Sequence, residues 1–156
     1  MFLYEAFPPE LILVGFDAKN KDQAFKELVE HFCHTEKSHA QDEILETLWE
    51  REFKMSTGII NGVAIPHGRT NAIEAVRGIL GISRKGIAYD ALDGQPVYLI
   101  FMLLAPKTLT EKHLRLLKRL AELLDNSDFY TDLLAQKDSQ AANRIIKDYE
   151  DSLDNF

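Results

Sequence analysis

The amino-acid sequence predicts an α/β fold in three layers, a mixed β-sheet flanked by helices on both sides. Stretches whose apolar residues repeat at helical spacing alternate with short apolar runs of strand length, and the connections are longer than hairpin loops. One run, Val97–Ala105, is apolar throughout, which is typical of a strand buried on both faces of a sheet. A chain of 156 residues predicts a single domain spanning 1–156.

The first third of the chain predicts one strand followed by two helices. Pro8 and Pro9 end an N-terminal segment that we expect to be loose, and residues 10–16 have the length and composition of a strand. A helix follows from about Lys21 and a second spans about 41–53, because apolar residues recur there on one face. The two apolar stripes are Ala24, Phe25, Leu28, Val29 and Phe32 in the first helix, and Ile44, Leu45, Leu48 and Trp49 in the second.

The centre of the chain predicts strands. Segment 58–65 combines glycines with β-branched residues, which indicates a strand or hairpin rather than a helix. Residues 75–83 and Val97–Ala105 form two further strands, and Asp93-Gly94 is a turn signal before the second of them.

The C-terminal part predicts three helices. The first begins near Thr108, where T-L-T-E has the spacing of a capping box that ends at Glu111. Two further helices, about 127–136 and 139–153, close the chain. The apolar stripe expected on the first of the three is Leu114, Leu117, Ala121 and Leu124.

The charge of the chain argues against nucleic acid and membrane surfaces as partners. A formal net charge of −7 and a pI near 5.2 would repel phosphates, and no stripe of basic residues offsets this charge. There is no basic leader and no apolar run of the roughly 18 residues that span a bilayer. The single cysteine, Cys33, fits a reducing compartment. We therefore expect a cytoplasmic protein without direct membrane insertion.

One histidine lies in the segment T-G-I-I-N-G-V-A-I-P-H-G-R-T, residues 57–70. Pro66 removes a backbone donor and keeps Ile65 extended, so the strand is predicted to end there, with His67 just beyond its carboxyl end. Ligands collect at that edge of open α/β sheets. Gly68 is expected to leave room for the close approach of another molecule.

The surroundings of His67 in the sequence are free of acidic residues. No Asp or Glu occurs between Phe53 and Ile73, although these types make up 25 of the 156 residues, and Lys54 and Arg69 are present. This pattern predicts a pocket that tolerates an anion, in which a neutral imidazole could act as a nucleophile. The alternative is an ordinary loop histidine bonded to a carbonyl, in a strand pair that carries few charges.

Two other residues are candidates for the same chemistry. His113 lies near the start of a predicted helix, where the positive end of the helix dipole favours a neutral imidazole and attracts anions. Arg51, on the second predicted helix, could make a bidentate phosphate contact. Taken alone, each is more often an ordinary surface residue.

Metal and nucleotide sites are not expected. His31, Cys33, His34 and His39 are close in sequence, but Cys33 falls on a different side of the helix from the first two histidines, so it is expected to be a small buried residue. The chain lacks the glycine-rich phosphate-binding loops of nucleotide-binding proteins. If phosphate chemistry takes place here, the phosphoryl group therefore arrives on another kind of donor.

Four stretches follow one another over nearly the whole chain: R-E at 51–52, S-T-G-I-I-N-G-V-A-I-P-H-G-R at 56–69, D-A-L-D-G-Q-P-V-Y-L-I-F-M-L-L-A-P at 90–106 and H-L-R-L-L-K-R-L-A-E-L-L at 113–124. In these stretches the chain resembles the fructose/mannitol-type IIA proteins of the bacterial phosphotransferase system. The T-G-x-x-x-G-x-A-I-P-H element is specific to that family. The D-A-L-D-G-Q-P-V run makes the chain most similar to the nitrogen-regulatory branch.

The resemblance implies a fold, a reaction and a set of residues. It implies a mixed sheet flanked by helices and a phosphotransferase in which His67 accepts a phosphoryl group from a phosphohistidine on an HPr-type carrier protein. By the same resemblance, Arg51 and His113 bind phosphoryl oxygens, and Thr57 and Arg69 are weaker candidates. No metal and no cofactor are implied, because transfer between two histidines needs positioning and charge stabilisation.

Three roles remain open for such a protein. It could be a regulator whose phosphorylated and free states bind different target proteins, a sugar-specific IIA that passes the phosphoryl group to a IIB domain, or an interaction module without transfer activity. The chain departs from the family at Ile60, where a glycine is common, and this change is expected to affect the turn or the partner-facing surface but not His67.

Overall fold

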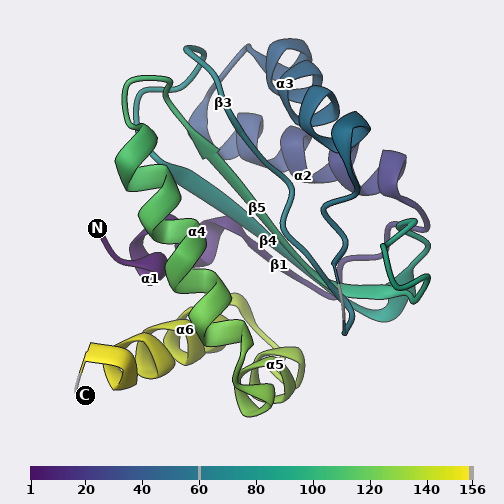
Figure 1. Ribbon diagram of the computed structural model, residues 1–156, viewed down its shortest axis with the longest axis vertical. Helices are drawn as coiled ribbons and strands as arrows, with labels where there is room; N and C mark the ends of the chain where they lie inside the picture. The colour runs from purple at the N-terminus through teal and green to yellow at the C-terminus, as the bar shows by residue number, and fades with distance from the viewer. Residues whose placement is uncertain (60, 155–156) are drawn as a thin grey trace.

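The computed structural model describes residues 1–59 and 61–154, which form a mixed β-sheet with helices on both faces (Figure 1). The predicted three-layer α/β fold is confirmed. The strands are β1 (Ile12–Val14), β2 (Val63–Ala64), β3 (His67–Arg69), β4 (Arg77–Ile87) and β5 (Val97–Ala105). The helices are α1 (Leu3–Ala6), the 3-10 turn η1 (Pro9–Leu11), α2 (Lys21–Glu36), α3 (Gln41–Lys54), α4 (Thr110–Leu124), α5 (Ser127–Leu134) and α6 (Ser139–Asp154).

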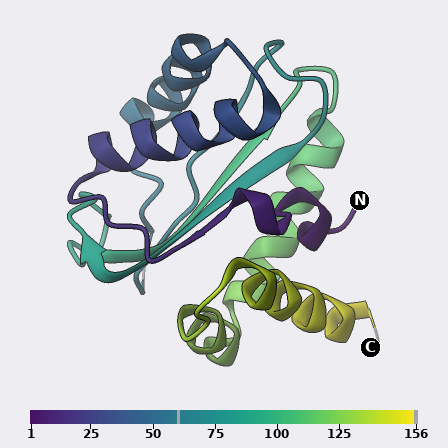
Figure 2. The ribbon, with the colours of Figure 1, turned by 180° about the vertical axis from the view of Figure 1, so that it is seen from behind.

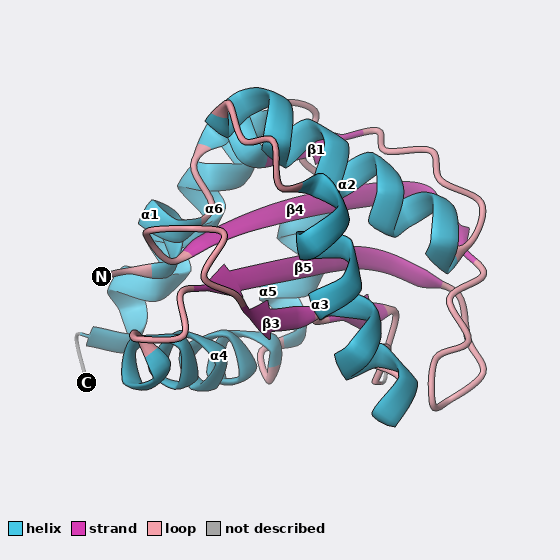
Figure 3. Ribbon diagram, turned by 90° about the horizontal axis from the view of Figure 1, so that it is seen from above, coloured by secondary structure: helices cyan, strands magenta, loops and turns pink. Residues whose placement is uncertain are grey.

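Strand β5 is the centre of the sheet. Its neighbours are β4, which is antiparallel to it, and the parallel strands β2 and β3, while β1 pairs in parallel with β4 (Figure 3). Residues of β5 face the two sides in alternation: Ile100, Met102 and Leu104 face one core, and Leu99, Phe101 and Leu103 face the other. The expectation that this strand is buried on both faces is confirmed.

The two cores are covered by different helices. Helices α2 and α3 pack on one face of the sheet, and α1, α4, α5 and α6 pack on the other (Figures 1 and 2). The predicted stripe of α2 is buried throughout, and Ile44 and Leu48 of α3 are buried as well. None of the helices in the described residues combines the length and the apolar character that crossing a bilayer requires.

Strands β2 and β3 together form one interrupted edge strand. Ala64 lies opposite Ile100 and His67 opposite Leu103, so the register along β5 is the same before and after the break. The break falls at Pro66, which has no N–H, but its carbonyl still accepts a hydrogen bond of 2.9 Å from Leu103 N. The strand before Pro66 ends as predicted, but His67 does not lie beyond the paired edge, because pairing resumes at His67 itself.

The expected hairpin within 58–65 is present. Gly58 and Ala64 form an antiparallel bridge, and Ile59 N donates to the carbonyl of Val63. Ile60, the position that departs from the family pattern, lies outside the described residues.

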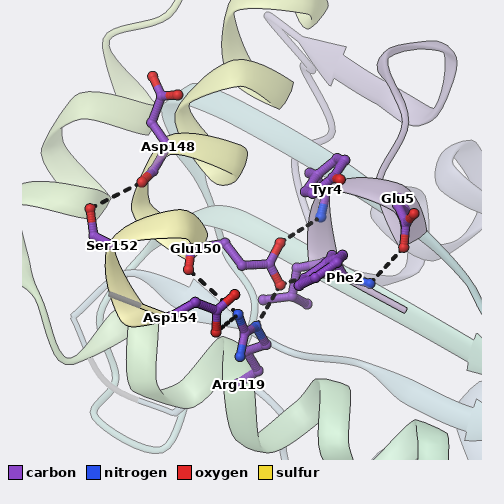
Figure 4. Close-up of polar contacts among 9 residues, drawn as sticks. Phe2, Tyr4, Glu5, Arg119, Asp148, Glu150, Ser152 and Asp154 are labelled. Carbon is purple, nitrogen blue, oxygen red and sulfur yellow. Dashed lines mark hydrogen bonds and ion pairs between the residues drawn. The ribbon is translucent and has the colours of Figure 1, made fainter. Parts of the chain in front are cut away.

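The prediction of a loose N-terminal segment is wrong, because this segment packs against α6. Leu3, Ala6 and Phe7 are almost fully buried. The buried Glu150 carboxylate of α6 accepts hydrogen bonds from Leu3 N at 2.7 Å and Tyr4 N at 3.2 Å, as the close-up in Figure 4 illustrates for Tyr4. These partners are nearly 150 positions apart in the sequence, so no local pattern could have predicted their contact.

Helix α4 differs from the prediction in its start and its buried face. It begins at Thr110, and its N-cap residue, Leu109, makes no side-chain capping bond, so the expected capping box at Thr108 is wrong. The helix buries Leu116, Leu120 and Leu123. The predicted stripe is the more exposed of two apolar stripes on a leucine-rich helix: Leu114 is 59% exposed, Ala121 is exposed, and Leu117 and Leu124 are only partly buried.

Candidate functional site

The rings of His67 and His113 meet edge to face in the lining of a pocket at the edge of the sheet. Their centroids are 5.8 Å apart and their planes meet at 64°. His67 opens β3, and His113 lies in the first turn of α4. The pocket has a volume of about 520 Å³. It is lined from α3 by Thr47, Glu50, Arg51 and Lys54, from β3 by His67, Gly68 and Arg69, and from the α4 side by Lys107, Thr110, His113, Leu114 and Leu117.

The tautomer of His67 follows from one hydrogen bond. Its Nδ1 lies 2.7 Å from the backbone carbonyl oxygen of Ile65. A carbonyl only accepts, so Nδ1 donates and carries the proton, which leaves the lone pair of the neutral ring on Nε2. Burial lowers the pKa of His67, and the Arg51 guanidinium lowers it further, while the Ile65 carbonyl and the Glu52 carboxylate act in the opposite direction. His67 is therefore neutral near pH 7.

His113 is a buried imidazole with an unused ring nitrogen. Its residue is 3% exposed, and within the described part of the chain its Nε2 has no hydrogen-bond partner. Burial lowers the pKa of His113 to about 4, and the neighbouring His67 and Arg69 lower it as well. Buried polar atoms without a partner are uncommon, so this nitrogen is a candidate contact for a group that enters the pocket.

Cations dominate the lining of the pocket. Among the described residues, the lining contains one carboxylate, Glu50, and four cationic side chains: Arg51, Lys54, Arg69 and Lys107. The acid-free window in the sequence thus identified a basic pocket, although Glu50, which lies just outside that window, also reaches it.

The two arginines are held by neighbouring groups. Arg51 Nη1 donates to the carbonyl of Met55 at 2.9 Å, and Arg69 Nη1 donates to the Thr110 hydroxyl at 2.6 Å. Arg69 is two residues after His67 on β3, so the two side chains leave the same face of the strand. Both guanidinium groups keep further N–H groups for an anion in the pocket.

Thr57 is not brought to this pocket. It is 4% exposed, and its hydroxyl donates to Glu52 Oε2 at 2.6 Å and lies 2.7 Å from the hydroxyl of Tyr89. The structure thus unites four of the five sequence candidates, His67, His113, Arg51 and Arg69, and places Thr57 in a separate buried network. Sequence reasoning missed Lys107 and Thr110, which follow the carboxyl end of β5 and could have been found there.

Gly68 lines the pocket and also packs against helix α3. A Cβ at this position would lie 2.7 Å from the Thr47 methyl group of α3. The missing Cβ of Gly68 therefore makes room for α3, a contact that the sequence did not indicate.

No metal-ligating cluster of three His, Cys, Asp or Glu residues exists among residues 1–59 and 61–154. Cys33 is buried, as expected, and burial raises the pKa of its thiol. The ring of His31 instead lies 2.7 Å from the backbone carbonyl of Glu10.

Fold and site together define a class of protein: an α/β protein that keeps a pair of neutral histidines in a basic pocket at the edge of its sheet. The chain belongs to the EIIA 2 family of the phosphoenolpyruvate-dependent sugar phosphotransferase system, whose model matches residues 5–149. The family resemblance read from the sequence is thereby confirmed. Proteins of this family are phosphotransfer components.

Individual relatives refine this assignment. The chain is 35% identical to the nitrogen regulatory protein of Bradyrhizobium diazoefficiens over 88% of this chain and 90% of that protein. The crystal structure of the nitrogen regulatory protein IIA-Ntr from Neisseria meningitidis superposes with a TM-score of 0.85 at 31% identity, covering 92% of this chain and 98% of that one. A fructose-specific EIIA component from Haloferax volcanii is 31% identical over 89% of this chain and 90% of its own length.

A more distant structure shares the fold alone. The Escherichia coli mannitol IIA protein, solved in complex with phosphorylated IIB, has a TM-score of 0.76 at 16% identity, covering 90% of this chain and 98% of that one.

Proposed function

We propose that this protein accepts a phosphoryl group on Nε2 of His67 from a phosphohistidine on a small HPr-type carrier protein. The observation that carries the proposal is the hydrogen bond from His67 Nδ1 to the Ile65 carbonyl, since it leaves the lone pair on Nε2, the ring nitrogen without that bond. A neutral imidazole is needed, because a protonated ring has no lone pair to offer.

The transfer requires no further reactant. The bond between phosphorus and the carrier's histidine nitrogen breaks, that nitrogen recovers its electron pair, and phosphorus forms a new bond to His67 Nε2. The dianionic phosphoryl group is stabilised by the guanidinium groups of Arg51 and Arg69 and by a hydrogen bond with His113. In that hydrogen bond the proton of the neutral His113 ring is on Nε2, which donates to a phosphoryl oxygen.

The rim of the pocket favours a protein as the donor. Leu114, beside His113, is 59% exposed and lines the pocket together with Leu117. Exposed apolar side chains next to a charged pocket are typical of protein interfaces rather than of sites for a small polar substrate.

A regulatory role is the first choice for the phosphorylated protein. The nitrogen regulatory proteins among its relatives support a regulator whose two states bind different target proteins. The second candidate is a sugar-specific IIA that passes the phosphoryl group to a IIB domain, supported by the fructose-specific relative. We further propose that the protein acts in the cytoplasm.

The test is phosphorylation in a purified relay. The protein is incubated with phosphoenolpyruvate, the first enzyme of the system and an HPr-type carrier, and intact mass is measured. We expect one acid-labile phosphate on the wild type and on His34→Gln, a matched variant of an exposed histidine on α2, and none on His67→Ala. A full phosphate on His67→Ala would overturn the assignment, and no phosphate on the wild type would overturn the function.

A further inference from the structure

A largely buried network lies close to His67 but outside the lining of the phosphoryl pocket. It consists of Lys21, Glu52, Thr57 and Tyr89. Glu52 follows Arg51 on α3, yet its side chain turns into the protein and is 2% exposed. The phosphoryl transfer proposed above does not use any of these four side chains.

The Glu52 carboxylate is fully engaged. Oε1 accepts from Lys21 Nζ at 2.8 Å and from Thr57 N at 3.0 Å, and Oε2 accepts from the Thr57 hydroxyl at 2.6 Å. Because that hydroxyl gives its only proton to Glu52, the Tyr89 hydroxyl, 2.7 Å away, must donate to it. Burial, together with the Glu52 charge, raises the pKa of Tyr89, so that it keeps the proton it donates.

From Glu52 a continuous series of hydrogen bonds runs to the ring of His67. Thr57 N donates to Glu52, and the carbonyl of Thr57 accepts from Ile65 N at 2.9 Å. The carbonyl of Ile65 then accepts from His67 Nδ1 at 2.7 Å. The carboxylate thus fixes the Thr57 backbone, Thr57 fixes Ile65, and Ile65 fixes which nitrogen of His67 carries the proton.

We propose that Glu52 is a positioning residue for phosphoryl transfer, which acts through the backbone of Thr57 and Ile65 to hold His67 in the tautomer with a free Nε2. This inference rests on the proposed function of His67. It also gives Thr57 a role other than phosphoryl binding, namely to connect the carboxylate to the hairpin.

The indirect arrangement has an electrostatic reason. In many catalytic sites a carboxylate bonds directly to the histidine and fixes its tautomer. Here a carboxylate in contact with His67 would repel the incoming phosphoryl dianion and favour the protonated ring. The Ile65 carbonyl fixes the tautomer without a formal charge. The negative charge of Glu52 is separated from His67 by the backbone of Thr57 and Ile65, and it is balanced by Lys21.

The segment that leads from α3 to Thr57 also contacts Arg51. Its Nη1 donates to the carbonyl of Met55, two residues before Thr57. The segment from Met55 to Thr57 is therefore held from one side by the guanidinium that faces the pocket and from the other by the buried carboxylate. Loss of the Glu52 contacts is expected to loosen both Arg51 and His67.

The test compares Glu52→Gln with Glu46→Gln, a matched variant of an exposed glutamate on the same helix. The readouts are the ¹⁵N chemical shifts of the His67 ring, which report its tautomer without any phosphoryl donor, and the rate of phosphoryl acceptance from the carrier. We expect Glu52→Gln to populate the tautomer protonated at Nε2 and to slow acceptance by about tenfold, as for other indirect partners of functional histidines. Glu46→Gln is expected to match the wild type in both.

A second variant, Lys21→Met/Glu52→Gln, removes the lysine charge that the single substitution leaves unpaired. It is expected to show the same change of tautomer with a smaller loss of thermal stability. Wild-type ring shifts and rates in the folded form of both variants would overturn the positioning role, even if thermal stability fell. That result would leave phosphorylation of His67 untouched, whereas failure of the wild type to accept phosphate would overturn the function itself.

Discussion

His67 Nδ1 lies 2.7 Å from the carbonyl oxygen of Ile65, and Pro66 separates the two residues. Pro66 has no N–H and interrupts the edge strand between β2 and β3, so Ile65 stands outside both paired segments. Its carbonyl is then available to the imidazole that follows. The A-I-P-H sequence therefore produces a local structure that selects one tautomer of its own histidine.

Acidification should destabilise the protein through His113. The pKa of this residue is about 4 in the folded state, against 6.5 as the unperturbed value. Because the folded pKa is lowered, the unfolded chain binds the proton first, so stability is unaffected above pH 6.5 and is lost as the pH falls toward 4. We expect a loss of up to about 3 kcal/mol from this group. Urea denaturation at pH 7 and pH 4.5 measures it.

The control for this pH dependence is His113→Gln, which cannot titrate. Carboxylates also contribute to acid denaturation, so the informative quantity is the difference between the wild type and this variant at the two pH values. An equal loss of stability in both proteins would contradict the assignment to His113.

His113 should also determine how long the phosphoryl group stays on His67. In His113→Ala the phosphoryl oxygens lose the imidazole donor and gain none in its place, and a hydrogen bond to a charged group is worth about 1.5–3 kcal/mol. We expect phosphate acceptance to be slower, or the phosphate to be lost sooner, by about tenfold. Rapid-quench sampling and the decay of the phosphorylated mass provide the two rates. Arg115→Gln, at an exposed position on α4, serves as the control, and rates equal to those of this variant would remove His113 from the site.

Arg51 should act on both the pKa of His67 and the rate of transfer. Its charge lowers the pKa of His67, so Arg51→Gln is expected to raise that pKa, as seen in an NMR titration of the ring. The same variant should slow phosphoryl acceptance by about a hundredfold, because one donor to the transferring group is lost. Arg51→Lys should restore the pKa more fully than the rate, since lysine lacks the planar fork of donors. Recovery of both to the same extent would argue against bidentate contact.

Sequence patterns predicted much of the fold, because the buried apolar side chains of a helix or strand recur at a regular spacing in the sequence. The stripe of α2 and the two-sided burial of β5 are periodic, and both were predicted correctly. The pattern failed in α4, where two leucine stripes compete and only the sheet decides that Leu116, Leu120 and Leu123 are buried. The pattern also failed at the N-terminus. There the helix that covers α1 lies at the other end of the chain, so no local pattern indicates the contact.

The site was predicted unevenly. The absence of acidic residues around His67 indicated an anion there. His113 and Arg51 were only weak candidates from the sequence, and the family resemblance connected them with His67. Thr57 and Glu52 could not be placed from the sequence, because a polar residue in a loop and a glutamate on a helix are normally exposed. Only the fold shows that Thr57 donates to Glu52.

Gly68→Ala tests whether β3 and α3 are in close contact. The new Cβ would lie 2.7 Å from the Thr47 methyl group, so either the strand or the helix must shift. We expect a loss of about 1–3 kcal/mol in the free energy of unfolding, as for other overpacked positions. The double variant Thr47→Ser/Gly68→Ala removes the methyl group and should recover most of that loss. A double variant no more stable than Gly68→Ala would show that the strain lies elsewhere.

Glu150 should be one of the most sensitive positions in the molecule, although it is far from the pocket. Its carboxylate is fully buried and accepts from Leu3 N, from Tyr4 N and from Arg119 Nε, the last at 2.6 Å. Arg119 also pairs with Asp154, so the N-terminal turn, α4 and the end of α6 meet at a network of two ion pairs, as Figure 4 shows. Glu150→Ala leaves the amides of Leu3 and Tyr4 without this acceptor, while Arg119, whose side chain is 21% exposed, keeps Asp154. Removal of one partner from a buried pair typically costs about 3–5 kcal/mol, and we expect a loss near the lower end of that range.

The experiment is urea denaturation of Glu150→Ala and of Glu122→Ala, a variant of an exposed glutamate on α4. Glu122→Ala is expected to remain close to the wild type, since exposed charges contribute little. Glu150→Gln should lie between the two, because its amide oxygen still accepts one of the backbone bonds but carries no charge for Arg119. Hydrogen exchange then shows which part of the protein is destabilised. The amides of residues 3–7 should lose protection in Glu150→Ala before those of the strands, because the carboxylate holds the N-terminal turn onto α6. Uniform loss of protection over the whole chain would instead mean that Glu150 supports the entire core and not this one contact.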